Sequence, residues 1–147
     1  MTTDKRSSAI FINGGAGRVI ASIPALEKFQ EENPDDNFVV VCEGGTDFFK
    51  GHPTLYARVY DHWHKGLFTD KLKERELITP EPYRVWEYYN QLCSIAQAYD
   101  IAINKKGLRE LHKPKIKLNK EEMIFGKKLV DEVREKTKKD KVVVFQP

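Results

Sequence analysis

The sequence predicts an α/β protein built on a doubly wound parallel sheet. Short apolar runs alternate along the chain with longer segments of helical periodicity, which is typical of parallel strands joined by crossover helices. The first run, Ser8 to Ile12, leads into glycines and then into an amphipathic helix. The second run, Phe38 to Cys42, is continuously apolar and rich in β-branched residues, which indicates a strand covered on both faces.

The first predicted helix spans residues 16–32. Its apolar residues recur on one face, at Val19, Ile23 and Leu26. Pro24 lies inside this pattern and removes one helical hydrogen bond, so we expect either a kink or two short helices that meet there. Residues 33–37, which read Asn-Pro-Asp-Asp-Asn, predict the turn that ends the helix.

The middle of the chain is less regular. A second glycine loop starts at Glu43 and leads into one expected helical turn at residues 47–50. We expect a third strand over residues 55–60 and a short helix near residues 71–76. A longer helix is predicted over residues 83–99 because apolar and aromatic residues recur there at helical spacing.

The C-terminal part predicts a strand, a helix and a last strand. Residues 100–104 are expected to form the fourth strand. Asn119 is the expected N-cap of a helix that continues to about residue 138. A last strand is predicted over residues 141–145. We expect residues 1–147 to form a single Rossmann-like domain, with residues 142–147 as the possible start of a second domain.

Composition narrows the class of protein. A chain of 147 residues can bury a sizeable core without a disulfide or a metal. No apolar run approaches the length of a membrane span, and the N-terminus leads into a strand and not into a signal peptide, so a cytoplasmic protein is expected. The two cysteines, Cys42 and Cys93, lack metal-ligand spacing and are expected to be buried free thiols.

The net charge of +3 is unevenly distributed along the chain. From Asn104 onward there are 14 basic and 7 acidic residues, and six basic residues cluster between Lys105 and Lys117. A solvated surface is the simpler interpretation, with an anionic partner as the alternative and at most peripheral contact with a membrane. Aromatic residues do not interleave with this cluster, so a nucleic-acid partner is not expected.

The glycine loop between the first strand and helix is the main candidate for function. Gly14, Gly15 and Gly17 could allow a tight turn and close packing, or let a ligand approach the helix N-terminus. The loop lacks the Gly-Lys-Ser/Thr ending of a phosphate-binding P-loop. It is also a poor dinucleotide fingerprint, although Glu43 at the end of the second strand would suit one.

The loop and the residues after it resemble the opening of a known family. Gly15-Ala16-Gly17-Arg18 precedes an apolar stretch, Pro24-Ala25-Leu26 and Asn33-Pro34. This order resembles the N-terminal half of GT-B glycosyltransferases of the lipopolysaccharide heptosyltransferase type (glycosyltransferase family 9). His52-Pro53 before Val59-Tyr60, Tyr99 to Ile103, and Val142 to Pro147 resemble later segments of that half.

The resemblance implies a Rossmann-like domain that forms the acceptor-side half of a GT-B architecture. Such a domain would bind a sugar acceptor, while a nucleotide-sugar donor would be held by the other half. Neither a cofactor nor a metal would be needed. The loop residues would then form the substrate-binding site, namely Asn13, Gly14, Gly15, Ala16, Gly17 and Arg18.

One residue departs from the family pattern. The family has an aspartate, its general base, at the position of Arg18, and an arginine stays protonated at ordinary pH. Another carboxylate could serve as the base, with Glu43 and Asp47 as the candidates. Arg18 could instead bind a phosphate or an acidic sugar beside the helix N-terminus. In the third possibility catalysis is lost and the chain is a non-catalytic nucleotide- or sugar-phosphate-binding domain.

Two further patterns have simpler explanations. His62 and His64 alternate as metal ligands can, but no third ligand is evident, and a surface location is expected. The aromatic residues between Tyr83 and Tyr89 could stack on a sugar, although core packing at helical spacing is the expected role.

A nicotinamide-dependent oxidoreductase is the remaining alternative for the function of the glycine loop. Oligomeric state is left open.

Overall fold

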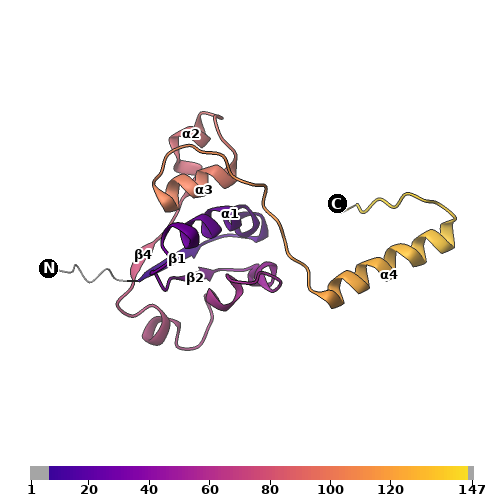
Figure 1. Ribbon diagram of the computed structural model, residues 1–147, viewed down its shortest axis with the longest axis horizontal. Coiled ribbons are helices and arrows are strands. Elements are labelled where there is room, and N and C mark those ends of the chain that lie inside the picture. The colour runs from indigo at the N-terminus through magenta and orange to yellow at the C-terminus, as the bar shows by residue number, and fades with distance from the viewer. Residues whose placement is uncertain (1–6, 146–147) are drawn as a thin grey trace. The chain divides into compact units, whose positions relative to one another are not determined.

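The computed structural model describes residues 7–145. The chain divides into two compact units, Met1–Lys117 and Leu118–Pro147. Each is described by itself below (Figure 1).

The first unit contains a four-stranded sheet in which all the pairings are parallel, so the α/β prediction is confirmed. Its strands are β1 (Ser8–Ile12), β2 (Val39–Cys42), β3 (Val59–Asp61) and β4 (Glu76–Ile78). Their order across the sheet is β3-β2-β1-β4. This all-parallel arrangement is compatible with a Rossmann-like fold.

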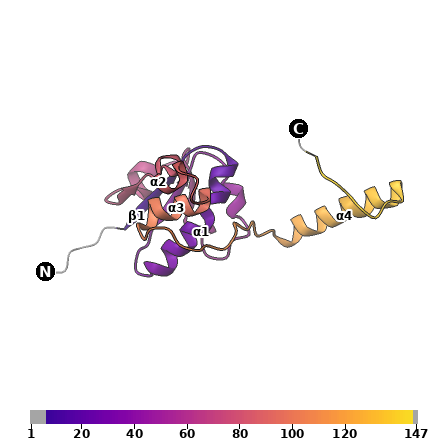
Figure 2. The ribbon, with the colours of Figure 1, turned by 90° about the horizontal axis from the view of Figure 1, so that it is seen from above.

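Helices α1 (Ala16–Glu32) and α3 (Ile95–Asn104) pack against each other, and their apolar side chains form a core with one face of the sheet. The two helices lie side by side in both views (Figures 1 and 2). Pro24 is buried inside α1, which continues through it as one helix. Inside this core, Phe29 and Phe38 pack edge to face with their ring centroids 5.0 Å apart.

The segment between β3 and β4 contributes to a second core, which forms on the opposite face of the sheet. Leu67 and Leu72 pack with Ala9, Val39 and Val41. Because apolar residues cover both faces of the sheet, all of β2 is buried, as its continuous apolar run predicts.

The fourth strand is not where the sequence predicts it. Residues 76–78 form β4 beside β1, whereas residues 100–104 belong to α3. The helix expected near residues 71–76 is also wrong, because the helical turn there is Leu67–Lys71 and ends where that helix should begin. The third strand is shorter than expected, since residues 56–58 form a 3₁₀ turn.

The long helix predicted over residues 83–99 is interrupted. The structure has a 3₁₀ turn at Pro82–Arg84, the one-turn helix α2 (Trp86–Tyr89) and then a separate start for α3. Gln91 adopts a positive φ of 61°, which no α-helix interior accommodates. Ser94 and Gln97 then form a capping box that begins α3. This Ser-x-x-Gln spacing is the sequence signal for the true helix start.

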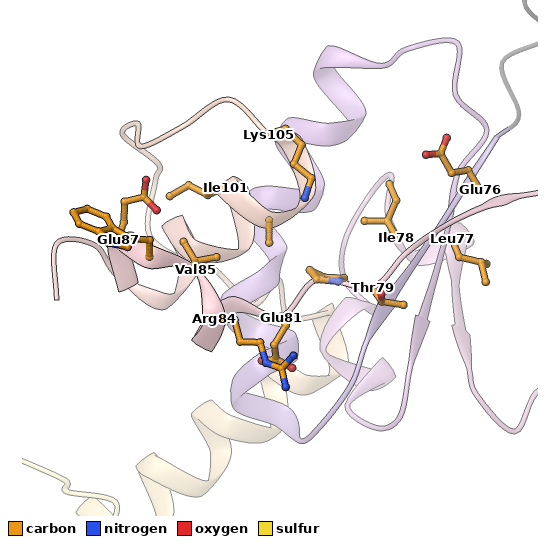
Figure 3. A pocket seen from close by; sticks show the side chains of 13 residues that line it. Glu76, Leu77, Ile78, Thr79, Glu81, Arg84, Val85, Glu87, Ile101 and Lys105 are labelled. Carbon is orange, nitrogen blue, oxygen red and sulfur yellow. The ribbon is translucent and has the colours of Figure 1, made fainter. Parts of the chain in front are cut away.

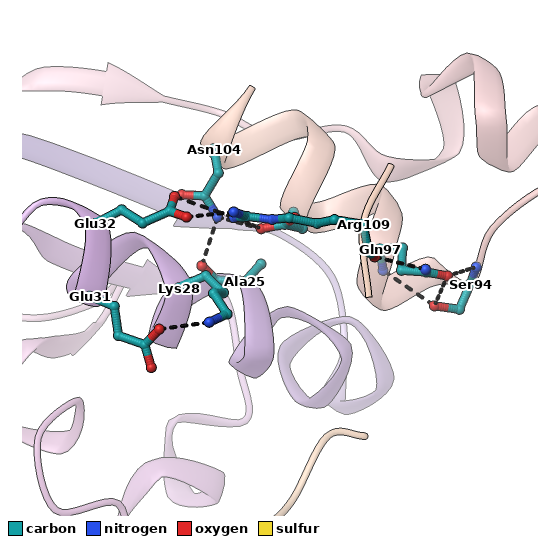
Figure 4. Close-up of polar contacts among 9 residues, drawn as sticks. Ala25, Lys28, Glu31, Glu32, Ser94, Gln97, Asn104 and Arg109 are labelled. Carbon is teal, nitrogen blue, oxygen red and sulfur yellow. Dashed lines mark hydrogen bonds and ion pairs between the residues drawn. The ribbon is translucent and has the colours of Figure 1, made fainter. Parts of the chain in front are cut away.

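The basic segment after α3 is tied to the helices by an ion-pair network (Figure 4). Arg109 donates to both carboxylate oxygens of Asp100 and also pairs with Glu32 at the end of α1. Asn104 donates to Asp100 and to the carbonyl oxygen of Ala25. At least one member of the basic cluster is therefore a structural residue and not part of a solvated surface.

The second unit contains helix α4 (Lys120–Thr137). Asn119 caps it through a reciprocal hydrogen-bond pair with Glu122, as the sequence predicts. The strand predicted over residues 141–145 is wrong, because within residues 118–145 the structure has no strand. β-branched residues favour a strand only where a partner strand is available.

One buried carboxylate holds the start of the sheet. Asp36 accepts hydrogen bonds from the backbone N–H of Ser8, at 2.9 Å, and from its hydroxyl, at 2.7 Å. We expect Asp36→Ala to lower the free energy of unfolding by about 2–3 kcal/mol, because buried donors lose a charged acceptor. Urea denaturation measures this loss, with the exposed neighbour Asp35→Ala as the matched control. Equal stabilities of the two variants would contradict the prediction.

Candidate functional site

The candidate site lies at the carboxyl edge of the parallel sheet. Asn13, Glu43, His62 and Thr79 each follow directly the last residue of one of the four strands. All four residues line a single cavity of about 160 Å³. In open α/β sheets, ligands bind outside the carboxyl ends of the strands. The usual place is beside a strand from which the chain continues to opposite sides of the sheet. Here β1 is that strand, because the chain returns from β3 to pair on its other side.

Two of these residues, His62 and Thr79, are not among the site residues predicted from the sequence. Thr79 is missed because the strand before it, β4, is not predicted. His62 is expected at the surface, yet its Nδ1 atom is buried and lies 3.6 Å from Asp61 Oδ1. The signal for His62 is its position immediately after a strand. Within residues 7–145, no three side chains of the metal-ligating types are arranged to hold a metal ion.

The glycine loop contacts the site through Gly14. Its φ of +88° is one that side-chain-bearing residues rarely adopt, and an added Cβ would lie 2.6 Å from Arg18 Cδ. The Gly14 N–H donates a 2.6 Å hydrogen bond to Glu43 Oε2. The loop thus holds the Glu43 carboxylate at the cavity.

Arg18 is paired within the protein. Its Nη2 donates to Glu81 Oε1 at 2.7 Å, and its Nε donates to the Tyr99 hydroxyl at 3.1 Å. Its guanidinium also lies 5.0 Å from the centre of the Tyr83 ring. Burial lowers the pKa of Arg18, but the contacts with Tyr99 and Glu81 outweigh it, so the pKa is raised. Burial in turn raises the pKa of Tyr99, against the opposing effect of Arg18. Both groups therefore stay protonated.

The structure separates the two carboxylates that the sequence offers as candidate bases. Glu43 lines the cavity. Asp47 lies on the 3₁₀ turn Thr46–Phe49, where its exposed side chain pairs with Lys50 at 2.7 Å. Of these two carboxylates, only Glu43 is among the described residues that form the cavity wall.

A larger cavity of about 560 Å³ adjoins the site, and Thr79 lines both. It lies between β4 and the helices α2 and α3 (Figure 3). Ile78, Val85 and Ile101 provide apolar lining, and Glu81 and Arg84 are among its charged residues. The carboxyl edge therefore opens toward a space that could hold more of a ligand than the small cavity alone.

Comparisons with known proteins add nothing to this geometry, since no protein-family model, curated protein or solved structure matches the chain. Among the described residues, no helix is both long and apolar enough to cross a membrane.

Proposed function

We propose that this chain is the acceptor-binding half of a GT-B glycosyltransferase and that it holds the hydroxyl of a sugar acceptor at the carboxyl edge of the sheet. One observation carries the proposal: Asn13, Glu43, His62 and Thr79, each following a different parallel strand, line the same cavity. Their amide, carboxylate, imidazole and hydroxyl groups can donate to and accept from sugar hydroxyls.

Glu43 is the proposed general base. A carboxylate beside the acceptor hydroxyl would take its proton while the oxygen attacks the anomeric carbon of a nucleotide sugar. The nucleoside diphosphate would leave, with its charge stabilised by cationic groups elsewhere. The cavity of about 160 Å³ is smaller than typical sites for whole ligands, so it would hold one hydroxyl-bearing edge of the sugar.

A non-catalytic domain that binds a nucleotide or a sugar phosphate is the second candidate, favoured by Arg18 at the position of the family's base. Two contacts count against it. The Gly14 N–H is already bonded to Glu43, and the Arg18 guanidinium is already bonded to Glu81. An anion at the loop would have to displace at least one of these carboxylates or be repelled by it.

We expect neutral methyl glycosides to perturb the backbone amide signals of Gly14, Glu43 and Thr79 in an NMR titration of the ¹⁵N-labelled chain. Glu43→Gln should weaken this binding about tenfold, because it replaces a charged hydrogen-bond acceptor with a neutral one. Glu31→Gln is the matched control, since Glu31 is exposed and pairs with Lys28 on α1.

Inorganic phosphate, titrated separately, distinguishes the two candidates. Perturbation of the same amides by phosphate and not by glycosides would support the non-catalytic domain. An absence of any response to glycosides, phosphate and nucleotide sugars would reject both.

A further inference from the structure

The segment around α2 exposes aromatic rings that the sequence predicts to be buried. Trp86 is 65% exposed and Tyr89 is 79% exposed, so the predicted core-packing role is wrong for both. The break in the helix causes this, because residues 83–89 no longer lie along one continuous apolar face. Exposed aromatic rings gathered in one place are typical of a binding surface.

Tyr89 and two other tyrosines of this segment line a cleft of about 530 Å³. Its lining consists of Tyr83, Tyr88, Tyr89, Gln91 and Cys93. The Tyr83 and Tyr88 rings pack edge to face, with centroids 5.6 Å apart and an interplanar angle of 68°. The cleft is thus lined by aromatic rings with a few polar groups, and its volume lies in the range of small-ligand sites.

The charge of the cleft limits what it can bind. The five lining residues include no carboxylate, lysine, arginine or histidine, and burial and the nearby Glu87 raise the pKa of the Cys93 thiol. A phosphate-bearing ligand would find no cation in this lining. A neutral ring with hydroxyl groups could stack on tyrosine and bond to phenol hydroxyls and to the Gln91 amide.

The side chain of Arg18, which follows the loop glycines, contacts Tyr83 in the lining of the cleft. Arg18 lies over the ring of Tyr83 while it bonds to Tyr99 and Glu81. Tyr83 is therefore held in place from one side by Arg18, in the first turn of α1. A platform that is already ordered loses little conformational entropy when a ligand stacks on it.

We propose that the cleft binds a neutral saccharide ring. The proposal rests on the proposed function and deepens it: the cleft would hold a further ring of the acceptor whose reacting hydroxyl lies at Glu43. Stacking on exposed tyrosines supplies affinity. The five lining residues offer no cation, and the nearby Arg18 is already paired with Glu81, so phosphorylated sugars and nucleotides are disfavoured.

The test is an NMR titration of the ¹⁵N-labelled chain with lactose and maltotriose, with uridine as a neutral planar alternative and inorganic phosphate as the anion. We expect the two saccharides to perturb amides of residues 83–93. Tyr89→Ala should weaken their binding five- to tenfold, on the order of the loss of one stacked ring. Tyr89→Phe should retain most of the affinity. Tyr56→Ala, which removes a tyrosine 51% exposed elsewhere on the unit, should leave it unchanged.

Four results would overturn the inference: no saccharide response in residues 83–93, preference of the cleft for uridine, a response there to phosphate, or equal affinities for wild type and Tyr89→Ala. The position of the perturbed amides separates this inference from the proposed function. Responses limited to Gly14, Glu43 and Thr79 would reject the cleft and support the function. Responses limited to residues 83–93 would support the cleft as a saccharide site and reject the function at Glu43.

Discussion

Replacing Arg109 with alanine is expected to lower the free energy of unfolding by about 3–5 kcal/mol, because it leaves a buried charge without its partner. The Asp100 side chain is 1% exposed, and Arg109 bonds to it at 2.5 Å through Nε and at 2.8 Å through Nη2. Asn104 would remain as a neutral donor to Asp100. Urea denaturation of the whole chain measures the loss.

Two variants test the cause of this loss. Arg84→Ala, which removes an exposed arginine, should change stability by less than about 0.5 kcal/mol. The double variant Asp100→Asn/Arg109→Ala should recover part of the stability, because it also removes the unpaired charge. A loss below about 1 kcal/mol for Arg109→Ala would show that the network contributes little, since breaking a buried ion pair costs several times more.

Alkaline pH is expected to destabilise the protein through Cys42. Burial, together with the nearby Asp61, raises the pKa of the Cys42 thiol from 9.0 to about 12. The folded protein keeps this proton where the unfolded chain has lost it. The stabilisation is therefore complete below pH 9 and is lost as the pH rises from 9 to 12, by up to about 1.4 kcal/mol per pH unit.

Cys42→Ala isolates this contribution. Between about pH 8 and pH 10.5 the wild type should lose about 2 kcal/mol more stability than the variant, as measured by urea denaturation at each pH. Tyr99, whose pKa is also raised, acts in the same direction in both proteins, so it cancels in the comparison. Cys93→Ala is the control, because its half-buried thiol should contribute less. Parallel pH profiles for wild type and Cys42→Ala would refute the assignment.

The location of the candidate site is more predictable from the sequence than the contacts within it. The sequence analysis names Asn13 in the glycine loop and Glu43 at the end of the second strand, and both residues line the cavity. The roles of Arg18 and Asp47 depend on contacts that no sequence pattern specifies. Glu81 is 63 positions from Arg18, and the segment that leads into it is predicted as a helix near residues 71–76, whereas it contains strand β4.

Elements whose signals are local can be predicted from the sequence. The run from β1 through Gly14 into α1, the apolar β2 and the Asn119 cap depend on neighbouring residues, and all three form as predicted. The identity of the fourth strand and the set of residues that meet at the site depend instead on long-range packing. Residues 76–78 pair with the open edge of β1, while residues 95–104 bury Tyr99 and Ile103 against α1 as a helix. Strand pairing and burial against distant residues outweigh local propensity, because their free energy depends on partners that are far away in the sequence.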